Sequence, residues 1–156
     1  MNIQKQNGFS FIELMIVIGI SGILATLGIA NYFNYQRNVA IDKEGSRMVG
    51  YLREAIARAR SQQDNVTWAI HIENGASDYY ELLSGGATGT SIGRVYLDQG
   101  VTFTATTSSA TSTLVGGLTI SPVPSQINIG LTATNSSSTE EITVQTNGKV
   151  LRVKNY

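Results

Sequence analysis

The segment GFSFIELMIVIGISGILATLGIANY, residues 8–32, decides the fold of this chain. No charged side chain occurs from Leu14 to Gln36, and residues 14–20, LMIVIGI, are apolar on every side of a helix. A helix rises about 1.5 Å per residue, so about 20 apolar residues cross a bilayer. The alternative is a buried core helix, but such helices are usually shorter and carry a polar face. The segment therefore predicts a membrane-spanning helix.

A short polar leader, MNIQKQNG, precedes this apolar segment and carries Lys5 and the terminal amine. Positive charge on this side predicts that the N-terminus stays in the cytoplasm and that the bulk of the chain lies across the membrane. No small-residue cleavage site of the ordinary secretory type is evident before the polar residues that begin near Asn31. The pattern therefore differs from that of a common secretory signal.

One carboxylate, Glu13, interrupts the apolar segment. An ionised group at the bilayer centre costs about 2.5 to 3.5 kcal/mol, so such residues are usually paired and functional. No basic residue of the apolar segment can pair with it. Two explanations stay open: the side chain extends to the membrane surface, or its partner comes from another chain.

The composition excludes several classes of protein. The chain has 156 residues, with 11 basic and 11 acidic side chains, and only 14% of its residues are charged. These averages exclude a strongly basic nucleic-acid binder and a polytopic membrane protein. Without cysteine there is no disulfide scaffold, thiol nucleophile or thiolate metal site. The single histidine, His71, is predicted to be a half-exposed strand residue, and the pattern predicts no metal, no cofactor and no enzyme activity.

The charge is segregated along the chain. Residues 37–63 hold six basic and three acidic side chains, whereas residues 64–156 hold four basic and seven acidic ones. Within residues 37–63 apolar and small residues recur every three or four positions, which is typical of one face of a helix. They are Ile41, Gly45, Met48, Leu52, Ala55, Ile56 and Ala59. Arg47, Arg53 and Arg58, with Glu44 and Glu54, fall elsewhere, on a face that is solvated or, as the alternative, binds nucleic acid.

No proline interrupts residues 1–121. We therefore expect one nearly continuous helix from Phe9 to Gln63, about 80 Å long, whose second half packs its apolar stripe on a sheet. Alternating residues then predict antiparallel strands, with a turn at residues 74–78 and loops in the Gly-rich residues 84–93 and in two Ser/Thr runs, TTSSATST and TNSSSTEE. The strands are expected at residues 66–73, 79–83, 94–97, 101–106, 114–120, 127–132 and 141–146.

The dipeptide Asn147-Gly148 between two alternating runs predicts a final hairpin with a two-residue type I′ turn. This register pairs Val144 with Leu151, Ile142 with Val153 and Glu141 with Lys154. It leaves a small basic patch of three residues at the C-terminus: Lys149, Arg152 and Lys154. Such a patch predicts a modest, salt-sensitive affinity for DNA.

The N-terminal segment resembles the signature of type IV pilins and type II secretion pseudopilins. In that family a short basic leader ends in Gly, Phe follows, and Glu stands at the fifth position of the mature chain. Gly8, Phe9 and Glu13 match these positions one for one. The resemblance implies that a prepilin peptidase cuts between Gly8 and Phe9 and then N-methylates Phe9. Two positions depart from common patterns: Ser10 replaces a frequent Thr, and Ala30 stands where many members have Pro.

The resemblance implies that Glu13 acts in subunit assembly, and physical chemistry agrees with this role. Cleavage creates an ammonium group at Phe9, which the Glu13 carboxylate of a neighbouring subunit can meet in a stacked filament. Pairing in a medium of low dielectric recovers part of what each charge loses on desolvation. This pairing would also fix the axial offset between neighbouring subunits, because any other offset would leave a buried charge without a partner.

The resemblance also implies an α+β pilin fold, with a long N-terminal helix, half transmembrane and half amphipathic, on a C-terminal antiparallel β-sheet head. The head, with WAIHIE, YYELLSG and TNGKVLRVK, resembles that of the GspH/FimT-like minor pseudopilins. We expect a leader at residues 1–8, a transmembrane and assembly helix at 9–35, an amphipathic helix at 36–63 and a β-rich head at 64–156.

The function implied by this resemblance is that of a minor pilin or pseudopilin of a type IV pilus or type II secretion pseudopilus. The expected partners are other pilin subunits, the prepilin peptidase, an inner-membrane assembly platform and, before assembly, membrane lipid. The subunit would span the inner membrane once and then join a periplasmic or surface filament. The alternative, based on Lys149, Arg152 and Lys154, is a minor pilin that captures DNA during uptake.

Overall fold

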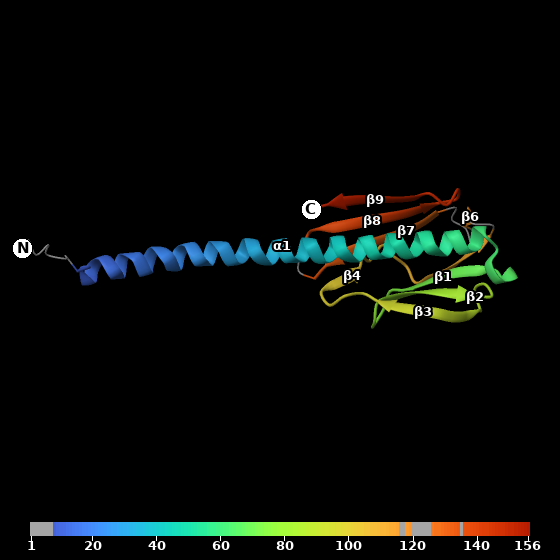
Figure 1. Cartoon of the computed structure of the whole chain (residues 1–156), viewed down its shortest axis with the longest axis horizontal. Helices are drawn as coiled ribbons and strands as arrows, with labels where there is room; N and C mark the ends of the chain where they lie inside the picture. The colour runs from blue at the N-terminus through green and yellow to red at the C-terminus, as the bar shows by residue number, and fades with distance from the viewer. Residues whose placement is uncertain (1–7, 116–117, 120–125, 135) are drawn as a thin grey trace, which may run out of the picture. The chain divides into compact units, whose positions relative to one another are not determined.

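A computed structural model of the chain describes residues 8–115, 118–119, 126–134 and 136–156. The predicted leader therefore lies outside the described residues, apart from Gly8. The chain divides into two compact units, one up to Gln36 and one from Arg37 onward. Helix α1 (Phe11–Arg60) runs through both units and is followed by the short 3₁₀ helix η1 (Gln63–Asn65) (Figure 1).

The long helix predicted over residues 9–63 is confirmed, with α1 ending at Arg60. The backbone after the helix enters the left-handed region at three residues that are not glycine: φ is 47° at Gln62, 60° at Asp64 and 53° at Asn65. Asp and Asn tolerate this conformation better than most residues. The left-handed turn stops the helix and redirects the chain into the first strand.

The described strands form two antiparallel sheets rather than the single sheet expected. In the five-stranded sheet, here called sheet A, the order is β3-β2-β1-β5-β6; in the four-stranded sheet B it is β4-β7-β8-β9. Sheet A contains β1 (Trp68–Glu73), β2 (Tyr79–Ser84), β3 (Thr90–Tyr96), β5 (Ala110–Val115) and β6 (Leu118–Thr119). Sheet B contains β4 (Val101–Phe103), β7 (Gln126–Ala133), β8 (Thr139–Gln145) and β9 (Val150–Asn155).

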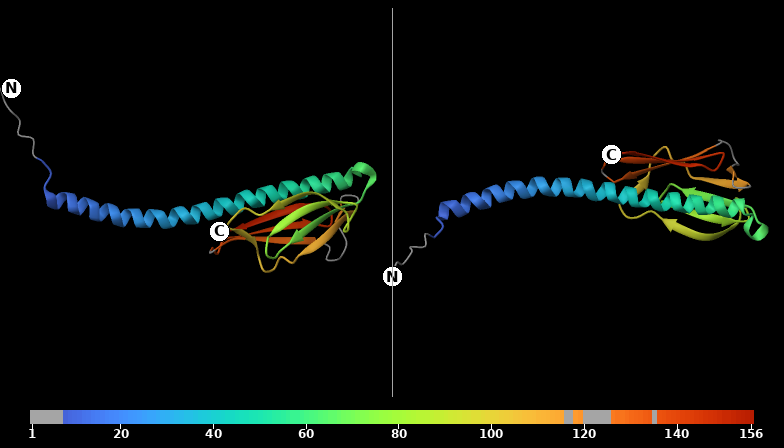
Figure 2. Two further views of the ribbon diagram at one scale, coloured as in Figure 1. Left: turned by 90° about the horizontal axis from the view of Figure 1, so that it is seen from below. Right: turned by 45° about the horizontal axis from the view of Figure 1, so that its top comes forward.

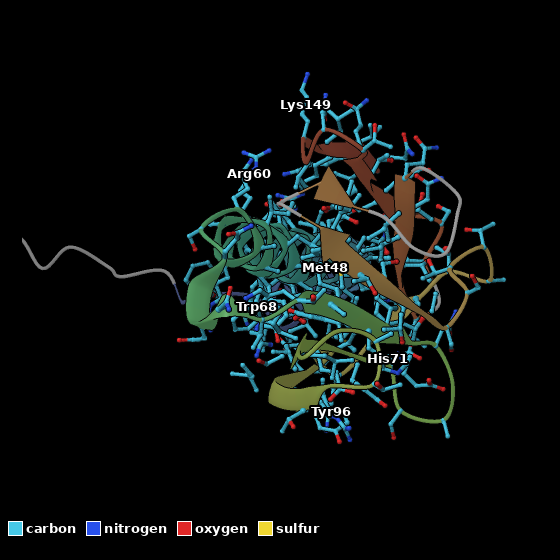
Figure 3. The ribbon with its side chains drawn as sticks, turned by 90° about the vertical axis from the view of Figure 1, so that its right-hand side faces the viewer. Met48, Arg60, Trp68, His71, Tyr96 and Lys149 are labelled. Atoms are coloured by element: carbon cyan, nitrogen blue, oxygen red, sulfur yellow. The ribbon has the colours of Figure 1, made fainter. Side chains whose placement is uncertain are left out.

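The apolar stripe of α1 that the sequence predicts is buried. All seven of its residues, from Ile41 to Ala59, are buried, and six of them join one core cluster with side chains of both sheets. Sheet A contributes Trp68, Ile70 and Tyr80 to this core, and sheet B contributes Ile129, Leu131 and Ile142. Within the second unit both sheets lie on the same side of the helix (Figure 2), and Met48 and Trp68 point into its interior (Figure 3). The helix therefore closes the core over both sheets.

Several strand boundaries differ from the prediction. Strand β3 begins at Thr90, inside the Gly-rich stretch expected to be a loop, and β5 occupies half of the run TTSSATST. Strand β4 ends at Phe103, three residues early, because the segment after it turns to hydrogen-bond with Gly130. The strand expected at 114–120 is instead the hairpin of β5 and β6, and Ile120 lies outside the described residues. Ser and Thr side chains suit both loops and strands, so composition alone did not separate the two.

The register predicted for the last hairpin is wrong by one residue. Val144 pairs with Val150, Ile142 with Arg152 and Glu140 with Lys154. The loop has three residues, closed by hydrogen bonds from Gly148 N to Gln145 O and from Gln145 N to Lys149 O, with Gly148 at φ 76°. This geometry matches a type I turn followed by a glycine in the left-handed conformation. The observed loop is therefore one residue longer than the predicted two-residue type I′ turn. The shift exposes Leu151 and Val153 and turns Arg152 toward the helix.

The charge pattern predicts an exposed Glu44, and this prediction is also wrong. Glu44 follows Ile41 by three residues and precedes Met48 by four, so it lies on the buried stripe and is fully buried. The hydroxyl of Tyr80 donates to Glu44 Oε1 at 3.3 Å, and Arg47 lies 3.6 Å from Oε2. Burial, and then the Glu44 carboxylate, raise the pKa of Tyr80. Its hydroxyl therefore keeps its proton and remains a donor to the buried carboxylate.

We predict that Gly45→Ala destabilises the protein by about 1 to 3 kcal/mol, a typical cost of overpacking. A Cβ atom at Gly45 would collide with the buried carboxylate of Glu140. The matched control is Gly50→Ala in the same helix, where a Cβ meets nothing within 4 Å. There alanine should be neutral or stabilising by up to about 1 kcal/mol. Urea unfolding of both full-length variants in detergent measures the difference, and equal stabilities would contradict the steric argument.

Candidate functional site

The N-terminal motif lies where the backbone enters α1. The carbonyl of Ser10 accepts hydrogen bonds from the backbone N–H groups of Glu13 (3.1 Å) and Leu14 (3.2 Å), which opens the first turn. Phe9 precedes the helix with 87% of its surface exposed. Glu13 is in the first turn, where the helix dipole favours a negative charge. The predicted cleavage and assembly residues are thus exposed and next to one another.

The apolar side chains that the structure describes in the helical part of the first unit are exposed all round the helix. Ile12, Leu14, Ile18, Ile23 and Leu24 are each more than half exposed. The helix contains an apolar window long enough to cross a membrane, and none of that window is buried. Exposed apolar surface of this extent needs lipid or other protein chains to cover it.

Glu13 makes no ion pair and no side-chain hydrogen bond with any residue that the structure describes. The described residues therefore leave both explanations of this carboxylate open. The partner required by the assembly explanation, the amine of a processed Phe9, belongs to a different chemical state of the chain.

At the C-terminal end, the predicted basic patch is instead an ionic cluster. Arg152 of β9 pairs with both carboxylate oxygens of Glu140 on β8 and with Asp42 Oδ1 of α1 at 2.6 Å. It also donates to the carbonyl of Asp42 at 2.8 Å and to Ser46 Oγ at 2.9 Å. Glu140 is fully buried. One guanidinium therefore fastens the last strand to the helix and neutralises a buried charge.

The other two cations of the predicted patch lie apart from each other. Lys154 pairs with Asp42, and its hydrogen bond, followed by the charges of Arg152 and Lys154, lowers the pKa of that carboxyl despite some desolvation. Lys149 is exposed beside the hairpin loop and points away from the core (Figure 3). Two of the three cations are thus occupied by carboxylates of the same chain. The DNA contact stays a prediction, and this geometry does not favour it.

His71 lies on the outer face of sheet A, with partners of its own. Its Nδ1 is 2.8 Å from Thr111 Oγ1, and its Nε2 is 3.5 Å from Glu73 Oε2. No group of three metal-ligating side chains occurs among the described residues. His71 is half-buried, as the strand pattern predicts.

Sequence reasoning missed Glu140 and Asp42 as partners of Arg152, although a signal for Glu140 was present. Glu140 alternates with Ile142 and Val144 along β8, and all three are buried. The period of two therefore places it on the core face. The partner could not be inferred, because the wrong hairpin register turned Arg152 to the opposite face.

Comparison with known proteins bears on the N-terminal segment. Residues 3–29 match the family model of the prokaryotic N-terminal methylation motif. Over 37 residues the chain is 57% identical to prepilin peptidase-dependent protein D of Escherichia coli strain K12, an alignment that covers 24% of this chain and 25% of that protein. Both matches support the type IV pilin and pseudopilin family.

This pilin-like chain spans about a quarter of the length of the curated relative it matches. No solved structure gives a significant match. The resemblance of the head to GspH/FimT-like pseudopilins therefore stays a prediction. The layout of one long helix with antiparallel sheets in the C-terminal region is that of a pilin-like α+β protein.

We predict that Arg152→Met destabilises the pilin-like head by about 3 to 5 kcal/mol, because it leaves the buried Glu140 without a partner. The matched control is Lys154→Met, which removes a partly exposed ion pair with Asp42 and should cost at most about 1 kcal/mol. Urea unfolding of the full-length variants in detergent measures both. Comparable losses in the two variants would show that burial of Glu140 does not control the effect.

Proposed function

We propose that this chain is a structural subunit of a type IV pilus or type II secretion pseudopilus, a minor pilin or pseudopilin, anchored in the inner membrane until it is assembled. The observation that carries the proposal is the apolar first unit of α1, which is unburied in the single chain and which the match to the methylation motif, residues 3–29, largely covers. Such a surface suits lipid before assembly and neighbouring helices afterwards.

Processing is proposed to occur between Gly8 and Phe9, with N-methylation of Phe9. Both residues are exposed and precede the first helical residue, so a peptidase can reach the bond without unwinding α1. Residues 1–8 would then be the leader, 9–35 the transmembrane and assembly helix, 36–63 the amphipathic helix and 64–156 the head. The relative's printed name, a prepilin peptidase-dependent protein, supports processing of this kind.

Assembly is proposed to depend on Glu13 and on an inner-membrane platform that adds subunits to the filament. The N-terminus would face the cytoplasm and the head the opposite side, leading to a periplasmic or surface filament. Because Glu13 is retained, we favour a subunit within the filament over a tip subunit, which in secretion pseudopili commonly lacks this residue. A role without enzyme activity follows from this proposal.

Mass spectrometry of the mature chain tests the processing step. We expect an N-terminus at Phe9 that carries one added methyl group, in cells that contain a prepilin peptidase. Without the peptidase the chain should keep residues 1–8. A mature chain that begins at any other residue would refute the proposed cleavage.

Replacement of Glu13 tests the assembly step. Glu13→Ala should leave membrane insertion intact, since it removes a charge from an apolar helix, but should greatly reduce incorporation into filaments. The matched control is Ile12→Ala, which truncates the neighbouring exposed side chain and keeps the carboxylate. Fractionation of membranes and sheared filaments measures both variants. Normal incorporation of Glu13→Ala would argue against pairing with the Phe9 amine.

A further inference from the structure

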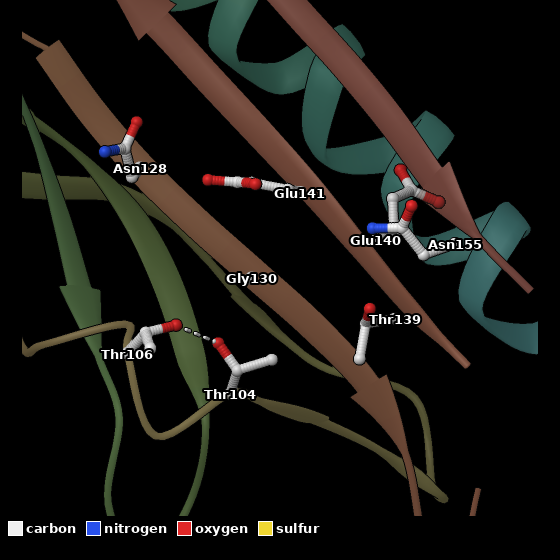
Figure 4. A pocket seen from close by; sticks show the side chains of 8 residues that line it. All are labelled: Thr104, Thr106, Asn128, Gly130, Thr139, Glu140, Glu141 and Asn155. Atoms are coloured by element: carbon white, nitrogen blue, oxygen red, sulfur yellow. Dashed lines mark hydrogen bonds between the residues drawn. The ribbon is translucent and has the colours of Figure 1, made fainter. Parts of the chain in front are cut away.

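The outer face of sheet B contains a polar hollow that the assembly motif does not use. Its volume is about 480 Å³, within the usual range for binding pockets. The hollow is formed by β7, β8, the end of β9 and the segment after β4 (Figure 4). The lining used below consists of Thr104, Thr106, Asn128, Gly130, Thr139 and Glu141.

Gly130 lets the segment after β4 lie close against β7, because a Cβ atom there would collide with the side chain of Thr104. The Thr107 hydroxyl holds the segment after β4 against β7: it accepts from Gly130 N at 2.7 Å and donates to Gly130 O at 3.2 Å. Thr104 and Thr106 are joined by a hydrogen bond of 2.8 Å between their hydroxyls. The wall opposite Glu141 is therefore fixed by hydrogen bonds before any partner arrives.

The chemistry of the hollow suits a positively charged hydrogen-bond donor. Glu141 is exposed, and its side chain makes no ion pair or hydrogen bond with any described residue. Asn128, Thr106 and Thr139 add amide and hydroxyl oxygens around it. No basic side chain belongs to the described lining, and the other carboxylate there, Glu140, is already paired with Arg152. An anionic ligand is therefore disfavoured.

The chain itself offers a matching group. Among the described cationic side chains, those of Arg53 and Lys149 make no ion pair or hydrogen bond. A planar guanidinium with five donors fits several oxygens at once, whereas an ammonium acts as a point charge. Arg53 is exposed on α1 beside Gly50 and Ala57, which are also exposed and too small to shield it. Arg53 is thus the better match for the hollow.

Arg53 and Glu141 cannot meet within one chain. Glu141 lies between Glu140 and Ile142, which both face the core under the helix, so its own side chain points to the far side of sheet B. Arg53 stands on the helix, on the other side of that sheet. Complementary groups on two different faces give a heterologous contact, which extends into an open filament when the rotation does not close.

We propose that the hollow around Glu141 receives the Arg53 guanidinium of a second copy of this chain. The contact gives the heads a directional, head-to-tail attachment in addition to the one made by the N-terminal segment. It rests on the proposed function, since it operates between subunits brought together by assembly.

Charge reversal tests the contact in cells that carry the chain's own assembly machinery. Glu141→Arg and Arg53→Glu should each lower the yield of sheared filaments about tenfold, a change typical of losing one close charge pair. The double variant should restore the yield. The control Lys149→Glu should leave the yield unchanged. Wild-type yields in both single variants, or no recovery in the double variant, would overturn the proposal.

Cysteine cross-linking gives a second readout, because the natural chain has no cysteine. Filaments of a variant with Glu141→Cys and Arg53→Cys should give a ladder of disulfide-linked multimers on oxidation. The pair Glu141→Cys and Lys149→Cys should give none. A ladder from the control pair alone would overturn the assignment of Arg53.

The failure of this contact is distinguishable from failure of the proposed function. Arg53 and Glu141 are both exposed, so the charge-reversal variants are expected to fold normally. An unchanged thermal unfolding temperature of the detergent-solubilised variants would confirm this. Normal processing at Phe9 together with wild-type filament yields in the charge-reversal variants would refute the contact but not the proposed function. An unprocessed wild-type chain without filaments would refute the function itself.

Discussion

Burial of one apolar stripe on α1 is the constraint on which the rest of the second unit depends. Sheets A and B each present one apolar face, and a single helix covers both. The spacing of three and four residues between Ile41 and Ala59 keeps these side chains in line for five turns. Two residues on this stripe carry no apolar side chain, and both are buried. Gly45 leaves space for the Glu140 carboxylate, and Glu44 is buried because its position in the helix faces the core.

The patterns that follow from period and composition were predictable. The helix, its stripe and the first hairpin of sheet A follow from repeats of 3.6 and 2, and the N-terminal motif from an apolar segment with one carboxylate. The division of the strands into two sheets could not be predicted, because it depends on pairing between strands that are far apart in the sequence. At the last hairpin the sequence Thr146-Asn147-Gly148 suits both a two-residue and a three-residue loop. That single added residue decides whether Arg152 is a surface cation or the partner of the buried Glu140.

The closure of the C-terminal strand is ionic. A guanidinium on β9 reaches a buried carboxylate on β8 and a carboxylate on α1, so the last strand is fixed to both its neighbours in space. With no cysteine in the chain, this closure does not depend on the redox state of the compartment in which it forms. The head can therefore reach its final form without an oxidation step.

The close packing at Gly45 also restricts how the sequence can change over time. A larger residue at position 45 would collide with the Glu140 carboxylate. Loss of Glu140 would remove the buried partner of Arg152, and loss of Arg152 would leave the buried Glu140 without its cation. Each single replacement passes through a less stable protein. Positions 45, 140 and 152 are therefore expected to vary together among descendants of this chain, although up to 107 residues separate them.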